Sequence, residues 1–197
     1  MAGRGLRVIA GEFGGLRLSV PRGDRTRPTS DRVKESLFGA LGERVIDARV
    51  LDLYAGSGSL AIEAISRGAL SGVCVERDAM ALRSIATNIE SARVGDRLIV
   101  RGRAVEAYLA DSSSGVQQDG PFDLVFVDPP YETPNEIISG HLGVIRSTSS
   151  LAVGGAVVVE RSSDSEALLD PYWLVTWSRT YGDTLLMVFE PRLEPNQ

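Results

Sequence analysis

The sequence predicts an α/β fold in which a mostly parallel sheet of seven strands carries helices on both faces and ends in an antiparallel hairpin. From residue 49 onward, short apolar runs alternate four times with segments of helical periodicity, a pattern typical of parallel sheets. The run FDLVFVD (122–128) is almost continuously apolar, as expected for a strand buried on both faces. The chain has 197 residues, 43% of them hydrophobic and 24% charged, so one globular domain with a small extension accounts for its length.

The first 41 residues form the predicted extension. LRVIA (6–10) and LRLSV (16–20) flank a glycine-rich turn, which indicates a β-hairpin. A helix is expected over residues 31–41, because apolar side chains recur there at helical spacing, at Val33, Leu37 and Leu41. We therefore divide the chain into a basic extension, residues 1–41, and an α/β domain, residues 42–197.

The α/β domain alternates strands and helices in a regular order. Its seven strands are expected at residues 49–55, 72–76, 97–102, 122–128, 155–160, 174–180 and 184–189. Helices are expected before Gly68 and at residues 78–93, 105–110 and 135–147. The low-complexity stretch DSSSGVQQDG (111–120) is predicted to be a flexible loop. Right-handed crossovers place the carboxyl ends of the parallel strands at one edge of the sheet, where ligands of such folds bind.

Charge is divided unevenly along the chain. Residues 1–36 carry eight basic and four acidic side chains, whereas the other 161 residues carry 13 basic and 22 acidic ones. A basic extension on an acidic body is typical of a protein that meets a polyanion at one end, and nucleic acid is the obvious candidate. The alternative interpretation of this pattern is a solvated surface rich in arginine.

Several classes of protein are disfavoured by composition. No run of about 18 apolar residues that could span a membrane is present. A single cysteine and a single histidine exclude an intrachain disulfide and leave too few ligands for a zinc site, so no metal is expected. The amino terminus lacks the apolar core of a secretory signal, and we therefore expect a cytoplasmic protein.

A glycine turn follows the first predicted strand. Gly56 and Gly58 allow the backbone to turn sharply and to approach a ligand closely. Glu76 ends the second strand 20 residues after Gly56, where a carboxylate can accept hydrogen bonds from the hydroxyl groups of a ribose. Asp52 lies within the end of the first strand and could face an ammonium group of a ligand. The turn alone is compatible with a dinucleotide or with S-adenosylmethionine.

The tetrapeptide Asp128-Pro129-Pro130-Tyr131 distinguishes between these cofactors. It follows the buried fourth strand, and the prolines stop that strand and hold the Asp128 carboxylate in place. A carboxylate and a backbone carbonyl there can accept the N–H groups of a nucleobase amine and stabilise the charge that develops on nitrogen. Tyr131 offers a flat face on which the base can stack. The motif therefore predicts methyl transfer to an exocyclic amine, with S-adenosylmethionine as the donor.

Together these stretches resemble the bacterial 16S rRNA guanine-N2 methyltransferase family. The similar segments are RVIAGEFGGLRL, RPTSDRVKESLFGAL, LDLYAGSGSLAIEAISRGA, VFVDPPY and YGDTLLMVFE, and they cover almost the whole chain. The resemblance implies a Rossmann-like class I methyltransferase fold that uses S-adenosyl-L-methionine to methylate guanine 966, in rRNA numbering. It also implies a partner, 16S rRNA in an assembling small ribosomal subunit. We expect a monomer without membrane attachment.

The resemblance also implies roles for individual residues. Asp128, Pro129 and Tyr131 match the catalytic motif. The expected cofactor contacts are Asp52, Tyr54, Gly56, Ser57, Gly58, Glu76, Arg77, Arg103, Ala104 and Asp128. The expected RNA contacts are Arg27, Thr29, Arg32, Lys34 and Tyr131. The segment Arg101–Ala104 departs from the acid or amide that related enzymes often place against adenine, so the Ala104 backbone or a neighbour is expected to make that contact.

Three other functions remain open at this point. The DPPY motif is shared with enzymes that methylate adenine N6 or cytosine N4 in DNA. A dehydrogenase that uses NAD is compatible with the glycine turn and Glu76, but it leaves the DPPY motif unexplained. An RNA-binding module without catalytic activity would leave the glycine turn unexplained.

Overall fold

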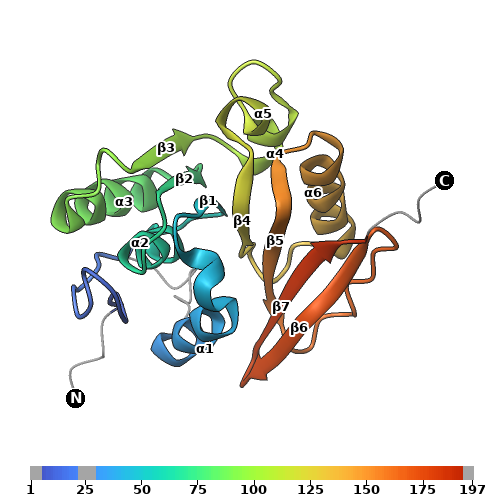
Figure 1. Ribbon diagram of the computed structural model, residues 1–197, viewed down its shortest axis with the longest axis horizontal. Helices are drawn as coiled ribbons and strands as arrows, with labels where there is room; N and C mark the ends of the chain where they lie inside the picture. The colour runs from blue at the N-terminus through green and yellow to red at the C-terminus, as the bar shows by residue number, and fades with distance from the viewer. Residues whose placement is uncertain (1–5, 22–29, 193–197) are drawn as a thin grey trace.

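A computed structural model describes residues 6–21 and 30–192 of the chain. One seven-stranded sheet in the order β3-β2-β1-β4-β5-β7-β6 organises this part of the molecule (Figure 1). Its strands are β1 (Arg49–Leu53), β2 (Ser71–Glu76), β3 (Leu98–Gly102), β4 (Phe122–Val127), β5 (Leu151–Ser162), β6 (Trp173–Tyr181) and β7 (Thr184–Pro191). Strands β1 to β5 pair in parallel, and β7 pairs antiparallel with both β5 and β6. The predicted mostly parallel sheet with a terminal hairpin is confirmed.

Helices cover both faces of the sheet. They are α1 (Asp31–Leu41), the 3₁₀ helix η1 (Gly42–Val45), α2 (Ser59–Ser66), α3 (Ala79–Ala92), α4 (Val105–Ala110), α5 (Val116–Asp119) and α6 (Asn135–Ser147). The first apolar cluster joins α1, α2 and α3 to one face, and the second joins α4, α5 and α6 to the other. Successive strand residues enter opposite clusters, because side chains alternate across a strand. In β4, for example, Phe126 belongs to the first cluster and Val127 to the second.

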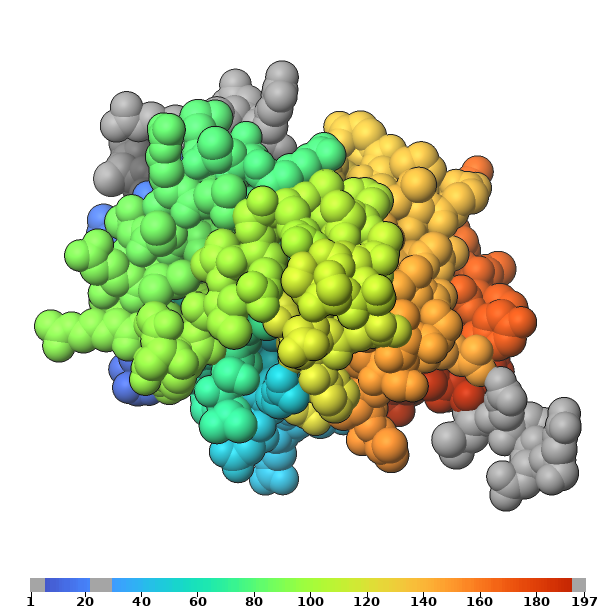
Figure 2. Space-filling view, turned by 90° about the horizontal axis from the view of Figure 1, so that it is seen from above, coloured from blue at the N-terminus to red at the C-terminus, as the bar shows by residue number. Residues whose placement is uncertain are grey.

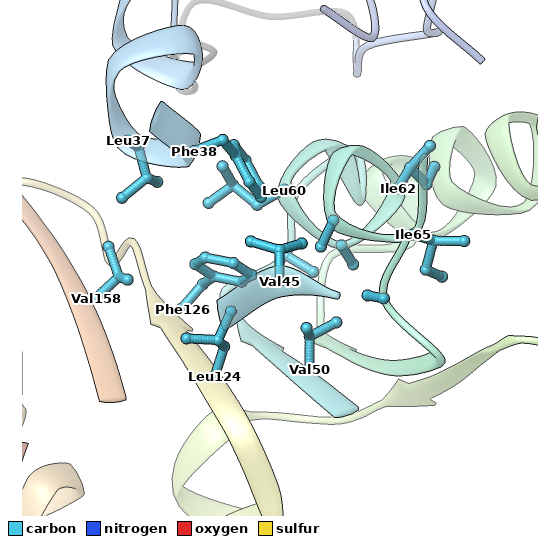
Figure 3. Packing of buried hydrophobic residues seen from close by; sticks show 14 of the residues in the cluster. Leu37, Phe38, Val45, Val50, Leu60, Ile62, Ile65, Leu124, Phe126 and Val158 are labelled. Carbon is cyan, nitrogen blue, oxygen red and sulfur yellow. The ribbon is translucent and has the colours of Figure 1, made fainter. Parts of the chain in front are cut away.

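The first cluster includes the residues of the amino-terminal extension. Leu6, Val8 and Leu18 are buried in it together with the apolar face of α1. Figure 3 shows Leu37 and Phe38 of α1 near Leu60 of α2 and above strand residues such as Phe126. The extension is therefore packed on the body of the protein through a shared core.

The predicted hairpin in the extension is smaller than expected. Its ladder is reduced to one antiparallel bridge, Arg7 with Arg17, flanked by backbone bonds such as Leu18 N–H to the Leu6 carbonyl at 2.8 Å. Two backbone donors bind α2 instead, since Ile9 and Ala10 donate to the Glu63 carboxylate. Sequence periodicity alone does not reveal this competition for backbone groups.

The prediction of a flexible loop over residues 111–120 is wrong. The segment contains helix α5, and Val116 is completely buried. Asp119 accepts hydrogen bonds from Arg101 and from the Tyr108 hydroxyl, which anchors the segment to β3 and α4. Figure 2 shows α4 and α5, in yellow-green, between α3 in green and α6 in gold. Val116, through burial, and Asp119, through its hydrogen bonds, thus order a stretch whose composition suggests a loop.

Candidate functional site

The carboxyl ends of three neighbouring strands bring the predicted site together. In the sheet register Leu53 of β1 pairs with Val75 of β2 and with Val127 of β4. Glu76 and Asp128 each follow directly, so the two carboxylates flank the turn that leaves β1. Neighbouring strands lie about 4.8 Å apart, which puts the two flanking strands roughly 10 Å from each other. The glycine turn and the Asp128 motif therefore lie at the same edge, as the sequence predicts.

The turn after β1 has an unusual backbone. Tyr54, Gly56 and Gly58 all have positive φ angles, of 63°, 56° and 75°. Such angles suit glycine and strain other residues, so the two glycines are required by conformation. Gly58 is the amino-terminal cap of α2, and its N–H donates to the Ala55 carbonyl at 2.7 Å. Ser57, between the glycines, is buried.

Glu76 is held by backbone N–H groups from two segments. Its Oε2 accepts from Gly56 at 2.8 Å, and its Oε1 accepts from Arg77 and Asp78 at 2.7 Å each. A carboxylate offers about four acceptor positions, so these bonds leave one on Oε2. The predicted cofactor residue Arg77 takes part through its backbone, and it is exposed. Glu76 thus braces the glycine turn against the start of α3 and keeps acceptor capacity.

Asp52 lies one residue before the end of β1 and is only 1% exposed. Its Oδ2 accepts the Ala61 N–H of α2 at 3.2 Å. Burial, with a smaller contribution from the nearby Asp128 and Glu76 carboxylates, raises the pKa of Asp52 to about 8, and the bond from Ala61 acts in the opposite direction. The structure therefore gives Asp52 a bond to the first turn of α2, and its contact with a ligand ammonium stays a prediction.

Three carboxyl groups lie near one another at this edge of the sheet. Strand alternation puts Asp52 and Glu160 on the face of the first apolar cluster, and Asp128, directly after β4, is near enough to raise the pKa of Asp52. Glu160 follows Val159, the partner of Val127 in β4, and is 5% exposed. Glu160 was not predicted as a site residue, although GAVVVE ends in the same way as the second strand, GVCVE. A search for acids at all strand ends would have found it.

Residues of β5 and β7 hydrogen-bond to the loop that carries the Asp128 motif. Pro129 is buried, and Asp128 and Tyr131 are half-buried. The Tyr131 hydroxyl lies 3.1 Å from the Thr184 Oγ1 of β7. Arg161 of β5, 4% exposed, donates from one terminal nitrogen to the Thr133 carbonyl at 2.8 Å. These bonds orient the loop that carries the motif, and sequence reasoning missed Arg161.

The other predicted cofactor residues, Tyr54, Arg103 and Ala104, contact neighbouring protein groups. The Tyr54 hydroxyl lies 3.5 Å from His141 Nδ1, and burial, together with nearby Glu106, raises the pKa of Tyr54 to about 12. Arg103 pairs with Asp111 at 2.8 Å and also donates to Ser114. Ala104 caps α4. Their roles toward a cofactor stay predictions.

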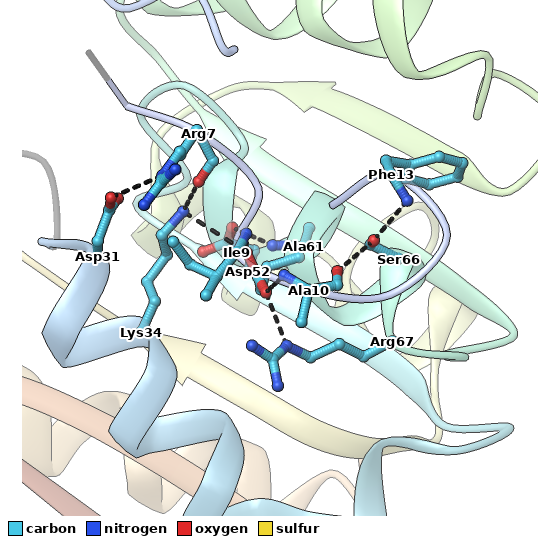
Figure 4. A network of polar contacts seen from close by, with 11 residues as sticks. Arg7, Ile9, Ala10, Phe13, Asp31, Lys34, Asp52, Ala61, Ser66 and Arg67 are labelled. Atoms are coloured by element: carbon cyan, nitrogen blue, oxygen red, sulfur yellow. Dashed lines mark hydrogen bonds and ion pairs between the residues drawn. The ribbon is translucent and has the colours of Figure 1, made fainter. Parts of the chain in front are cut away.

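The predicted RNA contacts have different outcomes. Arg27 and Thr29 lie outside the described residues, and Arg32 is exposed on α1. The assignment of Lys34 as an RNA contact is wrong, because its side chain is fully buried. Lys34 Nζ donates to the Arg7 carbonyl and lies 3.6 Å from Glu63 Oε2 (Figure 4). Burial lowers the pKa of Lys34, while Glu63 counteracts that effect.

The described residues contain neither a candidate membrane span nor a candidate metal cluster. Within residues 6–21 and 30–192, no helix combines the length and apolar character needed to cross a membrane. In the same ranges no three histidine, cysteine or acidic side chains gather in a way that could hold a metal ion.

Similar proteins are found by sequence and by structure. Residues 6–190 match the model of a family described as "Conserved hypothetical protein 95". "Ribosomal RNA small subunit methyltransferase D" of Escherichia coli is 37% identical over 126 residues, which are 64% of this chain and 60% of that protein. "Putative rRNA methyltransferase YlbH" of Bacillus subtilis is 33% identical over 95% of this chain and its own full length. The structure of "Putative methyltransferase yhhF from Escherichia coli" aligns with a TM-score of 0.80 and 27% identity, covering 96% of this chain and 99% of that one.

Proposed function

This chain belongs to the family described as conserved hypothetical protein 95, and from this premise we propose that it transfers a methyl group from S-adenosyl-L-methionine to small-subunit rRNA. The observation that carries the proposal is the sheet register, in which Glu76 and Asp128 flank the glycine turn. The names of the E. coli and B. subtilis relatives support an rRNA substrate. The acceptor we propose is the N2 amine of a guanine, the one at position 966 in rRNA numbering.

The residues around the glycine turn fit an adenosyl ligand with an amino-acid tail. Glu76 keeps an acceptor position on Oε2 that suits a ribose hydroxyl. The backbone at Gly56 and Gly58 allows close approach. Asp52 lies beneath the turn, and a nearby ammonium would favour its charged form. When bound, S-adenosylmethionine supplies an electrophilic methyl group on a sulfonium.

Asp128 orients the acceptor amine in this proposal. An exocyclic amine of a nucleobase is a poor nucleophile, because its lone pair is delocalised into the ring. The Asp128 carboxylate accepts one amine N–H, and a backbone carbonyl of the motif accepts the other. Positive charge that develops on nitrogen is then stabilised by acceptors already in place, and Asp128 takes up the surplus proton, directly or through water. Tyr131, oriented by Thr184, provides a stacking surface worth ~1–3 kcal/mol.

Glu160 supports guanine as the base. The Watson–Crick edge of guanine presents two neighbouring donors, N1–H and the N2 amine, whereas adenine presents an amine beside an acceptor nitrogen. In this proposal the carboxylates of Asp128 and Glu160, which follow the paired residues Val127 and Val159 of adjacent strands, accept these two donors. Two such acceptors suit the two donors of guanine and would repel the acceptor of adenine.

The extension, residues 1–41, is the RNA-binding element in this proposal. Its excess of basic side chains, including Arg27 and Arg32, suits phosphate contacts, and Thr29 lies in the same segment. We further propose that the protein acts as a monomer in the cytoplasm, on RNA within an assembling subunit. Transfer rates on naked RNA and on particles from a strain without the protein, with sedimentation of the protein, test these points.

The Asp128→Ala variant tests the catalytic role. Transfer of a tritiated methyl group to small-subunit RNA should fall about 10²–10³-fold, because the acceptor of the amine proton is lost. Affinity for S-adenosylhomocysteine, measured by calorimetry, should persist. Asp123→Asn is the matched control, since Asp123 lies at the opposite end of the same strand and accepts the Arg49 N–H. Full activity of Asp128→Ala would rule out the proposed role.

The methylated nucleoside identifies the acceptor. Mass spectrometry should find N2-methylguanosine in small-subunit RNA. N6-methyladenine or N4-methylcytosine in DNA would instead establish the alternative amino-methyltransferase. Thermal stabilisation by NAD without stabilisation by S-adenosylhomocysteine would favour a dehydrogenase.

A further inference from the structure

The side chain of Asn88 connects two functional segments of the chain. Asn88 lies on α3 and is 1% exposed. One of its contacts is the backbone of Ser57, within the glycine turn. The other is the backbone of Ser19, near the end of the first described segment of the extension.

Three of the four hydrogen-bonding positions of the amide are used in this link. Oδ1 accepts the Ser19 N–H at 2.7 Å. Nδ2 donates to the Ser19 carbonyl and to the Ser57 carbonyl, at 2.9 Å each. Only an amide of this length provides one acceptor and two donors here. Aspartate would place a carboxylate against two carbonyl oxygens, and leucine would leave the buried Ser57 carbonyl without this bond.

The two connected segments belong to different parts of the proposed site. Ser57 stands between Gly56, whose N–H binds Glu76, and Gly58, which caps α2. Ser19 comes shortly before the arginine-rich residues 22–29 in the sequence. After those residues, Asp31 of α1 pairs with Arg7 of the extension at 2.8 Å. Asn88 therefore fixes the chain where it enters the arginine-rich stretch and fixes the glycine turn at the same time.

We propose that Asn88 is a positioning residue that couples the cofactor site to the extension. A ligand that orders the glycine turn also orders Ser19 through the shared amide, and RNA held by the extension orders the turn in return. Such coupling is reciprocal in free energy, so each ligand tightens binding of the other by the same factor. The inference rests on the proposed function, since it takes the turn as the cofactor site and the extension as the RNA site.

Hydrogen exchange tests the link without any enzymatic readout. Saturating S-adenosylhomocysteine should slow amide exchange in a peptide spanning residues 16–21 of the wild-type protein by about fivefold or more. In Asn88→Leu the same ligand should still bind, but exchange in that peptide should not respond to it. An unresponsive wild-type peptide, or an equal response in Asn88→Leu, would overturn the proposal.

Binding of small-subunit RNA provides the second measurement. RNA affinity is determined with and without S-adenosylhomocysteine, and the ratio gives the coupling factor. We expect a factor of about five or more in the wild type and close to one in Asn88→Leu. Ser84→Ala is the matched control, because Ser84 is buried one turn earlier on α3 and its hydroxyl donates to the Met80 carbonyl of the same helix. It should keep the wild-type factor even where its melting temperature falls. Loss of coupling in Ser84→Ala as well would assign the effect to general destabilisation.

Ser19→Pro tests the link from its exposed end. Proline removes the N–H that donates to Asn88 and leaves the core around α3 intact, so this variant serves if Asn88→Leu does not fold. We expect a reduced coupling factor, and an unchanged factor would count against the link. Failure of the proposed function is distinguishable, since it would appear as no binding of S-adenosylhomocysteine by the wild-type protein.

Discussion

Replacement of Lys34 by methionine should destabilise the protein and leave RNA binding by the folded protein unchanged. The sequence suggests an RNA contact, but the side chains of Lys34 and Glu63 are both fully buried, with Nζ 3.6 Å from Oε2. Glu63 of α2 also accepts from Ile9 and Ala10 of the extension and from Arg67, so its carboxylate joins α2 to the extension and, through Lys34, to α1. Methionine conserves the volume of lysine and removes only its charge and its donors.

The geometry gives the size of the expected effect. Two unit charges 3.6 Å apart attract by ~4–5 kcal/mol at an effective dielectric constant of about 20. Removal of one partner of a buried pair typically costs about 3–5 kcal/mol. Arg67 remains 2.7 Å from Glu63 and offsets part of this loss, so we expect the free energy of unfolding to fall by about 3 kcal/mol. For a chain of this length that corresponds to a fall in melting temperature of roughly 6–12 °C.

Urea unfolding and RNA binding together provide the assay. Arg32→Met is the matched control, since Arg32 is exposed on the same helix, and it should change stability by less than about 0.5 kcal/mol. A double-mutant cycle of Lys34→Met with Glu63→Gln should show that the two losses are not additive. Weaker RNA binding by Lys34→Met with unchanged unfolding would refute this reasoning.

Three further predictions concern the site. Asp52→Asn should stabilise the protein increasingly as pH rises from about 4 to 8, because native Asp52, with a pKa near 8, binds a proton that its unfolded form has lost. Urea unfolding at several pH values measures this, and a difference in unfolding free energy between variant and wild type that does not change with pH would contradict it. Glu76→Ala should weaken binding of S-adenosylhomocysteine about 10- to 100-fold in calorimetry, since three N–H groups lose a charged acceptor, and unchanged affinity would exclude a cofactor role. Arg32→Glu should reduce the slope of log affinity for RNA against log salt by about one or more, whereas an identical slope would mean that Arg32 meets no phosphate.

Local patterns in the sequence were sufficient for most of the elements. Strand β4 and the strands before it were predicted within one or two residues, because a buried parallel strand is a continuous apolar run. Strand β5 starts at Leu151, earlier than the predicted residue 155, since Gly154 interrupts the apolar pattern of its first residues. The short helix α5 escaped prediction, because its stability comes from the contact of Asp119 with Arg101, 18 residues earlier in the chain.

The sequence by itself determined the α/β alternation and the residues at the ends of β1, β2 and β4, because strand periodicity and turn-forming glycine and proline act over a few neighbouring positions. Only the tertiary structure decided that Lys34 is a buried partner of Glu63 and not a surface cation. It also decided the contributions of Glu160, Arg161 and Asn88. Pairings between distant segments depend on how the helices and the extension pack on the sheet, and no local pattern encodes which buried polar groups then meet.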